Sequence, residues 1–413
     1  MKGYGQKAIF VGLLSMSLGC EHGPPQKQPV VGSDIAPGNI IIEVTSPKTG
    51  GDKFWRYQVM PSRGQVGGAR LMPRVTVKIS TPNFGMMTSE AVMKRFVIFA
   101  VVVIVVCLMT ARLARPQSAG QGKWSEKARL PETRGEVAVA SVNGKIYVLG
   151  GSARGRDDQP LNEEYDPATD RWRERAPMPR GLSHAGAVGM NGKVFVVGGF
   201  TRNVHMGALD VAFEYNPASD SWRTLAPLKS PRGSVGVTAL NGKIHAIGGR
   251  GVDTVTVATH EVYDPATGIW SELAPLPKAR DHLAVIAING RIHAIGGRFN
   301  ATADNTGMHD VYDPTTNSWQ SAAPLPTPRS AVAVTLYHDL ILVSGGECNN
   351  GKTFVENEAY DGKTGHWSSL APMPTGRHGF RAVTVGEFAY FPAGAQGCGG
   401  GEVSDTLLIF SLP

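Results

Sequence analysis

Short apolar stretches alternate with turn residues at regular intervals from residue 120 to the end of the chain. In one unit, the apolar stretch 136–142 is followed by Asn-Gly at 143–144, a dipeptide typical of two-residue β-hairpin turns. A second stretch, 145–151, ends in paired glycines, which accept positive φ and allow close backbone approach. A third ends in Tyr-Asp-Pro at 165–167, where proline presets a turn, and a fourth carries a tryptophan. The pattern predicts four short strands in each unit.

The unit repeats six times at a fixed register. Tryptophan recurs every 48 to 50 residues, at positions 124, 172, 222, 270, 319 and 367. Glycine pairs recur at 150–151, 198–199, 248–249, 296–297 and 345–346, with Ala-Gly at 393–394 as a degenerate sixth copy. Tyrosine recurs at 165, 215, 263, 312 and 360, with Phe410 in the sixth place. A period of this length indicates a repeat architecture, and we expect the recurring aromatic residues to form its core.

In combination, these motifs resemble kelch repeats, and the resemblance covers residues 120–413. It implies an all-β fold, a β-propeller of four-stranded blades around a central channel. Six tryptophans indicate six blades. The last unit ends near Phe410 without a tryptophan strand of its own, whereas Trp124 stands alone at the front. We therefore expect the strand around Trp124 to close the last blade, which removes an open sheet edge.

Two apolar runs precede the repeats. The first, 8–20, follows a basic start and ends at Cys20, and it resembles a bacterial lipoprotein signal. The second, 96–109, follows two basic residues; its 14 residues are fewer than the roughly 20 that span a bilayer and fit the core of a secretory signal. We expect residues 93–119 to be a signal peptide or, if uncleaved, a signal anchor and the one segment that contacts a membrane.

Residues 1–92 have two interpretations. The favoured one is an over-extended reading frame ahead of a natural start at Met93, because two export signals in one chain are unusual. The alternative is a small lipoprotein module in which 39–44 and 74–80 each form a strand. With either interpretation, we expect the large domain to be exported to the periplasm or the cell exterior.

The positive charge of the chain is concentrated ahead of the repeats. The formal net charge is +7, but residues 1–118 hold 14 of the 41 basic residues and only 5 of the 34 acidic ones. The remaining 27 basic and 29 acidic residues leave the repeats with a net charge of −2. Nucleic acid is therefore not an expected partner, because binding to phosphates needs a basic surface.

Arginines mark two sets of loops that emerge on the same face of such a meander. The loops that lead into the innermost strands place arginine at one register, in five of six units: Arg134, Arg232, Arg280, Arg329 and Arg377, with Leu182 in the second unit. The loops after the glycine pairs add Arg154, Arg156, Arg202, Arg250 and Arg298. Guanidinium groups bind carboxylate, phosphate or sulfate through paired hydrogen bonds.

The five arginines of the first set, here called the loop arginines, either brace neighbouring loops through carbonyl groups or bind a ligand. Arg250 and Arg298 are better ligand candidates, because their position after the glycine pair leaves them free of a bracing role. In kelch-domain ubiquitin-ligase adaptors, arginines at both registers bind acidic peptides. The resemblance therefore implies ligand contacts at four positions first: Arg232, Arg250, Arg280 and Arg298. Acidic residues two positions before the tyrosines are interpreted as polar groups at strand edges: Glu163, Glu261, Asp310 and Glu358.

Histidines and cysteines give weaker signals. His184 and His282 share a register in alternate units, a spacing that distributes them around a channel, so we expect no metal site and no cofactor. Cys348 and Cys398 follow glycine pairs in neighbouring units. They either form a disulfide between adjacent loops or remain two separate buried thiols.

Together, these features predict an exported, monomeric binding or interaction module that recognises an anionic ligand or an acidic protein segment. The alternative is an epimerase-, mutarotase- or lyase-like enzyme acting on an anionic sugar, with Glu347 as the acid/base. It rests on 345–352, which loosely resemble a segment of the N-acetylneuraminate epimerases, although the long inserted loops of that family are absent here. Enzymatic activity is therefore left open, with a binding role favoured.

Overall fold

The computed structural model describes three strands of the N-terminal part and residues 122–413 except 154–155, 157, 203–204 and 348–350. The chain divides into two compact units, Met1–Ala114 and Arg115–Pro413. In the first, β1 (Ile40–Thr45) pairs antiparallel with β2 (Arg56–Pro61) and parallel with β3 (Val75–Ile79). β1 and β3 coincide with the segments 39–44 and 74–80, which the sequence predicted as strands under the lipoprotein-module interpretation. Both predicted export signals lie outside the described residues. No helix among the described residues is long and apolar enough to cross a membrane.

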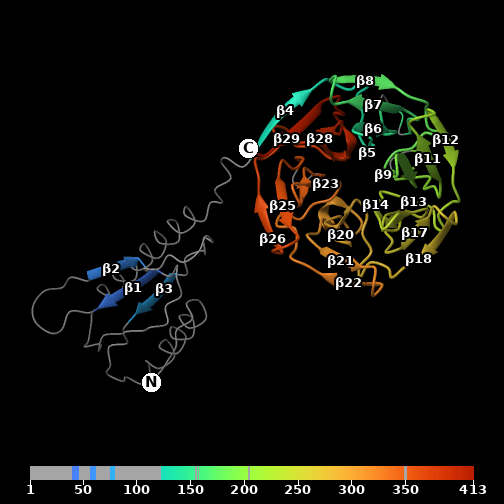
Figure 1. The fold of residues 1–413 in the computed structure, drawn as a ribbon. Helices are drawn as coiled ribbons and strands as arrows, with labels where there is room; N and C mark the ends of the chain where they lie inside the picture. Colours follow the sequence, from blue (N-terminus) through green and yellow to red (C-terminus); the bar gives the residue numbers. More distant parts are fainter. Residues whose placement is uncertain are drawn as a thin grey trace, which may run out of the picture. The chain divides into compact units, whose positions relative to one another are not determined.

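The second unit is a ring of six antiparallel four-stranded sheets, as the repeat predicted (Figure 1). Blade 1 contains β5 (Ala138–Val142), β6 (Lys145–Leu149), β7 (Asn162–Asp166) and β8 (Arg171–Glu174). Blade 2 contains β9 (Gly186–Met190), β10 (Lys193–Val197), β11 (Ala212–Asn216) and β12 (Ser221–Thr224). Blade 3 contains β14 (Gly236–Leu240), β15 (Lys243–Ile247), β17 (His260–Asp264) and β18 (Ile269–Glu272).

The other three blades repeat this arrangement. Blade 4 contains β19 (Ala284–Ile288), β20 (Arg291–Ile295), β21 (His309–Asp313) and β22 (Ser318–Ser321). Blade 5 contains β23 (Ala333–Tyr337), β24 (Leu340–Ser344), β25 (Asn357–Asp361) and β26 (His366–Ser369). Blade 6 contains β27 (Val383–Val385), β28 (Phe388–Pro392), β29 (Leu407–Ser411) and β4 (Lys123–Lys127).

Blade 6 is closed by the first strand of the propeller, as predicted. β4 pairs antiparallel with β29, and Trp124 lies opposite Phe410 in the register. The indole ring of Trp124 packs at centroid distances of 4.9 Å from Phe391 and 5.0 Å from Phe410. The sheet edge that β29 would otherwise expose is therefore paired.

The recurring tryptophans link each blade to the one before it. Each indole Nε1 donates a hydrogen bond of 2.7–2.9 Å to the carbonyl of an alanine that follows the outermost strand of the preceding blade; the pairs are Trp124–Ala371, Trp172–Ala128, Trp222–Ala176, Trp270–Ala226, Trp319–Ala274 and Trp367–Ala323. The tyrosines beside them are buried, which confirms their expected place in the core. Sequence motif and packing therefore coincide at the blade interfaces.

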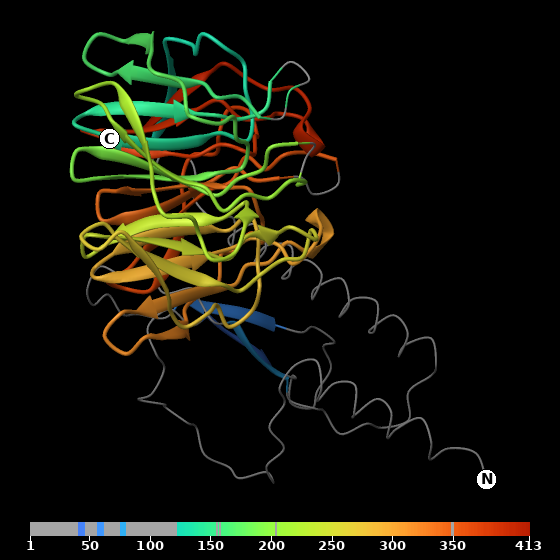
Figure 2. The same cartoon turned by 90° about the vertical axis from the view of Figure 1, so that its right-hand side faces the viewer.

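The loops between the second and third strands emerge on one face of the ring. Two of them contain short 3-10 turns, η1 (Thr302–Asp304, orange) and η2 (Cys398–Gly400, red), which lie on the same side in Figure 2. A third contains β16 (Arg250–Gly251), which pairs with β13 (Arg232–Gly233) from the loop before β14. In blade 3, the loop before the first strand and the loop after the second strand therefore continue the pairing of β14 and β15 toward that face.

Six residues at one register line the channel where these loops meet, and they form a closed ring of backbone hydrogen bonds. Each has a positive φ of 51–60°: Glu136, His184, Ser234, His282, Ala331 and Gly379. From blade to blade, the N–H of one ring residue donates to the carbonyl of the previous one over 2.8–3.3 Å, and Val137 N–H closes the circle on Gly379 over 3.2 Å. Positive φ is costly for residues with a side chain, so this ring fixes the direction of its side chains at the channel.

Candidate functional site

The loop arginines point into the blades, where buried carboxylates bind them. Within one blade each time, four of them form ion pairs with the acidic residue two positions before the tyrosine: Arg134–Glu163, Arg232–Glu261, Arg280–Asp310 and Arg329–Glu358. Their side chains are 0% exposed, and each also donates to a backbone carbonyl of the same blade. In the structure these four arginines brace their blades, which is one of the two roles expected for them, and their role in ligand binding stays a prediction.

Two blades depart from this pairing. In blade 2, Leu182 and Phe213 occupy the two positions, and both are buried. In blade 6, Arg377 is 1% exposed but donates to the Thr406 hydroxyl over 2.8 Å instead of a carboxylate, and burial lowers its pKa to about 10. Arg377 also lines a pocket with Gln396 and Ser404, so its ligand-binding role stays a prediction.

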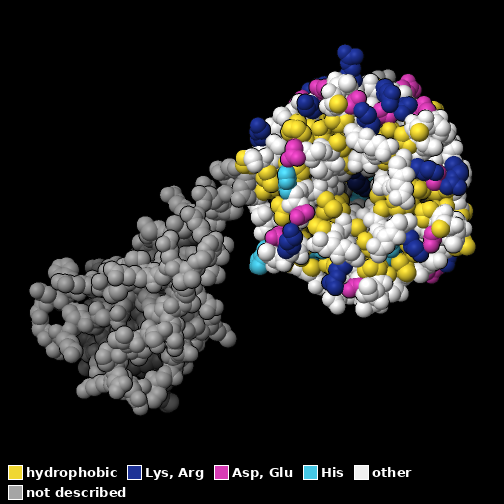
Figure 3. Space-filling view, in the orientation of Figure 1, with side chains coloured by type: hydrophobic (Ala, Val, Ile, Leu, Met, Phe, Trp, Pro, Cys, Tyr) yellow, Lys and Arg dark blue, Asp and Glu magenta, His cyan; other side chains and the backbone are white. Residues whose placement is uncertain are grey.

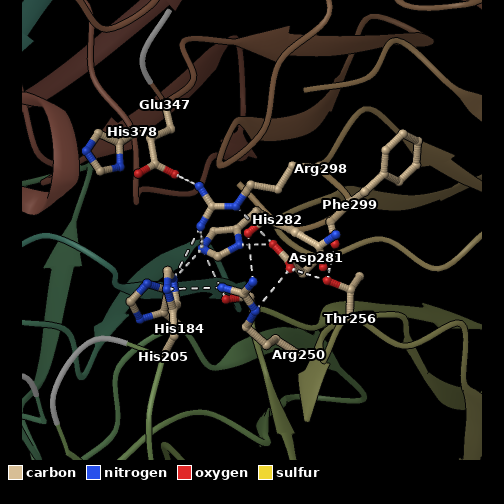
Figure 4. Close-up of polar contacts among 12 residues, drawn as sticks. His184, His205, Arg250, Thr256, Asp281, His282, Arg298, Phe299, Glu347 and His378 are labelled. Carbon is tan, nitrogen blue, oxygen red and sulfur yellow. Dashed lines mark hydrogen bonds and ion pairs between the residues drawn. The ribbon is translucent and has the colours of Figure 1, made fainter. Parts of the chain in front are cut away.

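Polar side chains from blades 2 to 6 converge instead at the loop end of the channel (Figure 4), and Glu136 of blade 1 contacts two of them. The set, here called the mouth cluster, is defined as Glu136, His184, His205, Arg250, Asp281, His282, Arg298, Glu347 and His378. Five members are ring residues or the residues directly before them, and three are the first residues after a glycine pair. The ninth, His205, lies in the loop between β10 and β11. A space-filling view shows the propeller hollowed at its centre, with a basic side chain inside the hollow (Figure 3).

Arg298 is at the centre of the mouth cluster and is 3% exposed. Its Nε donates to Asp281 Oδ1 over 3.1 Å, and its Nη1 pairs with the carboxylate of Glu347. Its Nη2 lies 3.4 Å from His205 Nε2 and 3.3 Å from His282 Nε2. Two carboxylates therefore balance its charge.

The guanidinium of Arg250 makes fewer charge-balancing contacts than that of Arg298. Its side chain is 12% exposed, its Nη2 donates to Asn300 O over 2.7 Å, and its Nη1 lies 3.5 Å from His205 Nδ1. Asp281 Oδ2 is 3.5 Å from its Nε, and this buried Nε–H has no hydrogen-bond partner among the described residues. Arg250 is thus the cation of the mouth cluster with spare hydrogen-bonding capacity.

The three histidines of the cluster contact one another directly. His205 Nε2 lies 3.2 Å from His282 Nε2, and the ring centroids of His184 and His282 are 5.4 Å apart. The expectation that the spacing distributes these residues around the channel is wrong, because the channel is narrow at the ring. Burial, together with the charges of His184 and Arg298, lowers the pKa of His205 to about 3. Burial and Arg298 also hold the pKa of His282 well below its usual range.

Glu136 links the histidines of blades 2 and 6. Its carboxylate lies 3.1 Å from His184 Nε2 and 3.3 Å from His378 Nδ1. Burial raises the pKa of Glu136, but the charge of His184 and the interaction with His378 outweigh it and hold the pKa well below its usual range. The same partnership outweighs burial at His378 and raises the pKa of that imidazole.

Glu347 and the two cysteines lie in the neighbouring loops. Glu347 is 8% exposed, and its carboxylate, the acid/base candidate of the enzyme alternative, is engaged in the ion pair with Arg298. Cys398 is disulfide-bonded, and the other three cysteines of the chain, including Cys348, lie outside the described residues. The pairing of Cys348 with Cys398 therefore stays a prediction.

Sequence reasoning found part of this site. Arg250, Arg298 and Glu347 were singled out, and the structure brings them together. Glu136 and His205 were missed. Glu136 had a signal, because it shares the ring register with His184 and His282. His205 had none, because it lies within the loop between β10 and β11, outside the positions that recur from unit to unit.

The comparisons with known proteins agree with this architecture. The Kelch motif matches residues 133–179, 181–229, 231–277 and 279–326, which are the first four units. No curated protein matches the chain. A solved structure described as "Structure of YjhT" is similar with a TM-score of 0.59 at 18% identity, over 69% of this chain and 97% of that one. At that identity, the similarity concerns the fold.

Proposed function

We propose that the six-bladed kelch propeller of residues 123–411 is a binding module that recognises an anionic group at the mouth cluster, through Arg250. Kelch propellers are typical protein-interaction modules, so an acidic protein segment is the ligand class that we favour. The observation that carries the proposal is the incomplete hydrogen bonding of Arg250 at the channel mouth. Its Nη2 donates to a backbone carbonyl, but its buried Nε–H has no hydrogen-bond partner among the described residues.

The surroundings of Asp281 explain why Arg250 has capacity for a ligand. Asp281 Oδ1 accepts from Arg298 and from His282 Nδ1, and Oδ2 accepts from the Thr256 hydroxyl over 2.8 Å. Arg250 therefore shares Asp281 with these donors, and its Nε remains 3.5 Å from Oδ2. A carboxylate from a ligand would supply the charge-assisted hydrogen bonds that Arg250 lacks.

We also propose that the protein is exported and acts as a monomer. The basic-then-apolar segment that begins at Met93 supports export, and so does the disulfide at Cys398, because disulfides persist in oxidising compartments. The closure of the ring by β4 supports a monomer, because it pairs the edge that β29 would otherwise offer to a second chain. A role as an enzyme on an anionic sugar has less support, because Glu347 would first have to leave Arg298.

Titration of the purified chain with an aspartate- and glutamate-rich peptide, sialic acid and galacturonic acid tests the proposal. Arg250→Ala is expected to weaken binding of the favoured anion by about 1.5–3 kcal/mol, the range for a hydrogen bond to a charged group. Arg202→Ala is the matched control, because Arg202 is an exposed arginine in the equivalent loop of blade 2. Failure of every anion to bind the wild-type chain would reject the proposal, and turnover of a sugar acid would favour the enzyme.

A further inference from the structure

The three histidines of the mouth cluster offer ligand atoms to one point in space. One nitrogen from each of His184, His205 and His282 lies within 4.8 Å of the other two. His184 and His282 come from the ring, two blades apart, and His205 comes from the loop between β10 and β11, with its imidazole centroid 4.9 Å from that of each of the other two. Figure 4 shows their rings clustered beside Arg250 and Arg298.

The spacing of two of these nitrogens matches that of two ligands on one metal ion. In a tetrahedral site with zinc–nitrogen bonds of 2.0–2.1 Å, two nitrogen ligands lie about 3.3 Å apart. His205 Nε2 and His282 Nε2 are 3.2 Å apart. We infer that His184, His205 and His282 form a binding site for a divalent transition-metal ion of the zinc class.

The backbone holds two of the ligands in place before any ion binds. His184 and His282 have φ values of 55° and 52°, and the N–H of each is bonded to the carbonyl of the preceding ring residue over 3.0 Å and 3.2 Å. A non-glycine residue persists in this conformation only where the surrounding structure imposes it, and such positions cluster at functional sites. The ring therefore preorganises the site.

A carboxylate also orients one ligand from behind. His282 Nδ1 lies 2.5 Å from Asp281 Oδ1, so that the ring proton sits on Nδ1 and Nε2 faces the other histidines. A histidine that ligates a metal commonly donates its second nitrogen to a carboxylate in this way. Imidazole ligands suit zinc, copper, iron and nickel, whereas calcium and magnesium prefer oxygen.

Arg298 lies beside two of the three ligand nitrogens. Its Nη2 lies 3.3 Å and 3.4 Å from the two Nε2 atoms, and its charge is balanced by Asp281 and Glu347. Three protein ligands leave one position open on a tetrahedral ion, which in such sites holds water or another small ligand. When an ion takes the lone pairs of these two nitrogens, the Nη2–H groups of Arg298 are released from them and can donate to an oxygen ligand in that position. The site does not depend on the anion recognition proposed for Arg250.

Metal content of the full chain tests this inference. The untagged protein is stripped with a chelator, dialysed against Zn²⁺, and analysed for bound metal; Co²⁺ is then used as a spectroscopic probe of geometry. One ion per chain is expected, together with the visible absorption of four-coordinate Co²⁺. Because these readouts need no anionic ligand, they are independent of the peptide and sugar titrations.

Two variants locate the ion. His205→Ala removes the loop ligand without touching the ring, and His282→Asn keeps a residue type that tolerates positive φ. Each is expected to weaken Zn²⁺ binding by at least roughly the 10–100-fold that loss of an outer-shell partner costs. His366→Ala, at an exposed histidine of β26, should bind as the wild type does. Absence of a bound ion in the wild type overturns the inference, as does unchanged affinity in both His205→Ala and His282→Asn.

Discussion

Gly379 provides the space that the carboxylate of Glu136 occupies. A Cβ atom at Gly379 would clash with Glu136 Oε1, and Gly379 itself has a φ of 60°. The contacts of Glu136 with His184 and His378 therefore depend on a residue without a side chain in blade 6.

Gly379→Ala should destabilise the propeller by about 1–3 kcal/mol, because it adds the cost of positive φ to a clash with a buried carboxylate. The free energy of unfolding in urea measures the loss. Gly386→Ala is the control for backbone strain alone, because Gly386 has a φ of 57° and a Cβ atom there would meet nothing within 4 Å. Adding Glu136→Ala should restore part of the stability, and a double variant no better than the single one would contradict the clash.

The buried pair Arg232–Glu261 should tolerate joint replacement better than the loss of one partner. Glu261→Leu leaves an unpaired charge in the blade and is expected to cost about 3–5 kcal/mol. The double variant Arg232→Leu/Glu261→Phe copies Leu182 and Phe213 of blade 2 and should be closer to the wild type. Chemical denaturation of the three proteins decides this, and a double variant less stable than Glu261→Leu would contradict it.

Acid should destabilise the propeller through its buried histidine pairs. His245 Nδ1 lies 2.9 Å from His260 Nε2, and burial lowers their pKa values to about 4 and about 3. Both rings are neutral in the folded state, whereas exposed histidines titrate near pH 6.5, so the unfolded chain binds more protons below that pH. The contribution of the neutral pair to the free energy of unfolding is therefore fully present above about pH 6.5 and is lost as the pH decreases toward about 4.

The contribution of this pair can be measured by replacing it with its blade 2 counterparts. Between pH 7.5 and pH 5.5, the wild type should lose about 2–3 kcal/mol more unfolding free energy than His245→Phe/His260→Ala, which copies Phe195 and Ala212. Equal pH dependence in the two proteins would show that the pair is not the cause.

The closure of blade 6 predicts where the stable domain begins. A chain that starts at residue 118 retains β4 and should unfold cooperatively, whereas one that starts at residue 130 exposes β29 and should aggregate. Melting temperature and the monomer fraction in size-exclusion chromatography provide the comparison. Equal values for the two chains would mean that the strand around Trp124 is dispensable.

The repeat in the sequence predicted the blades because each blade is built from the same few contacts. In five units a tyrosine is followed by a tryptophan, whereas Phe410 has no tryptophan after it and Trp124 has no tyrosine at that spacing before it. The sequence therefore predicted that these two residues complete one blade. Bracing by the loop arginines was one of the two roles predicted for them, but their carboxylate partners were not predicted, although Glu163 and its equivalents lie at a constant distance along the chain. The carboxylate partners of these arginines become apparent only when the first and third strands of a blade are placed together. His205 could not be predicted as a site residue, because the conformation of its loop does not follow from the repeat.

The indole hydrogen bonds between blades have a consequence for how the ring opens. Linear repeat arrays fray from their terminal units, because an end unit has only one neighbour. Here Trp124 and Trp172 join the last blade to its two neighbours, so no blade is terminal and local opening must break two interfaces at once. Blade 6 is the exception in covalent terms, since β4 and β29 are distant in the chain. Fraying of this propeller should therefore begin at that seam, and amide exchange in the remaining blades should be correspondingly uniform.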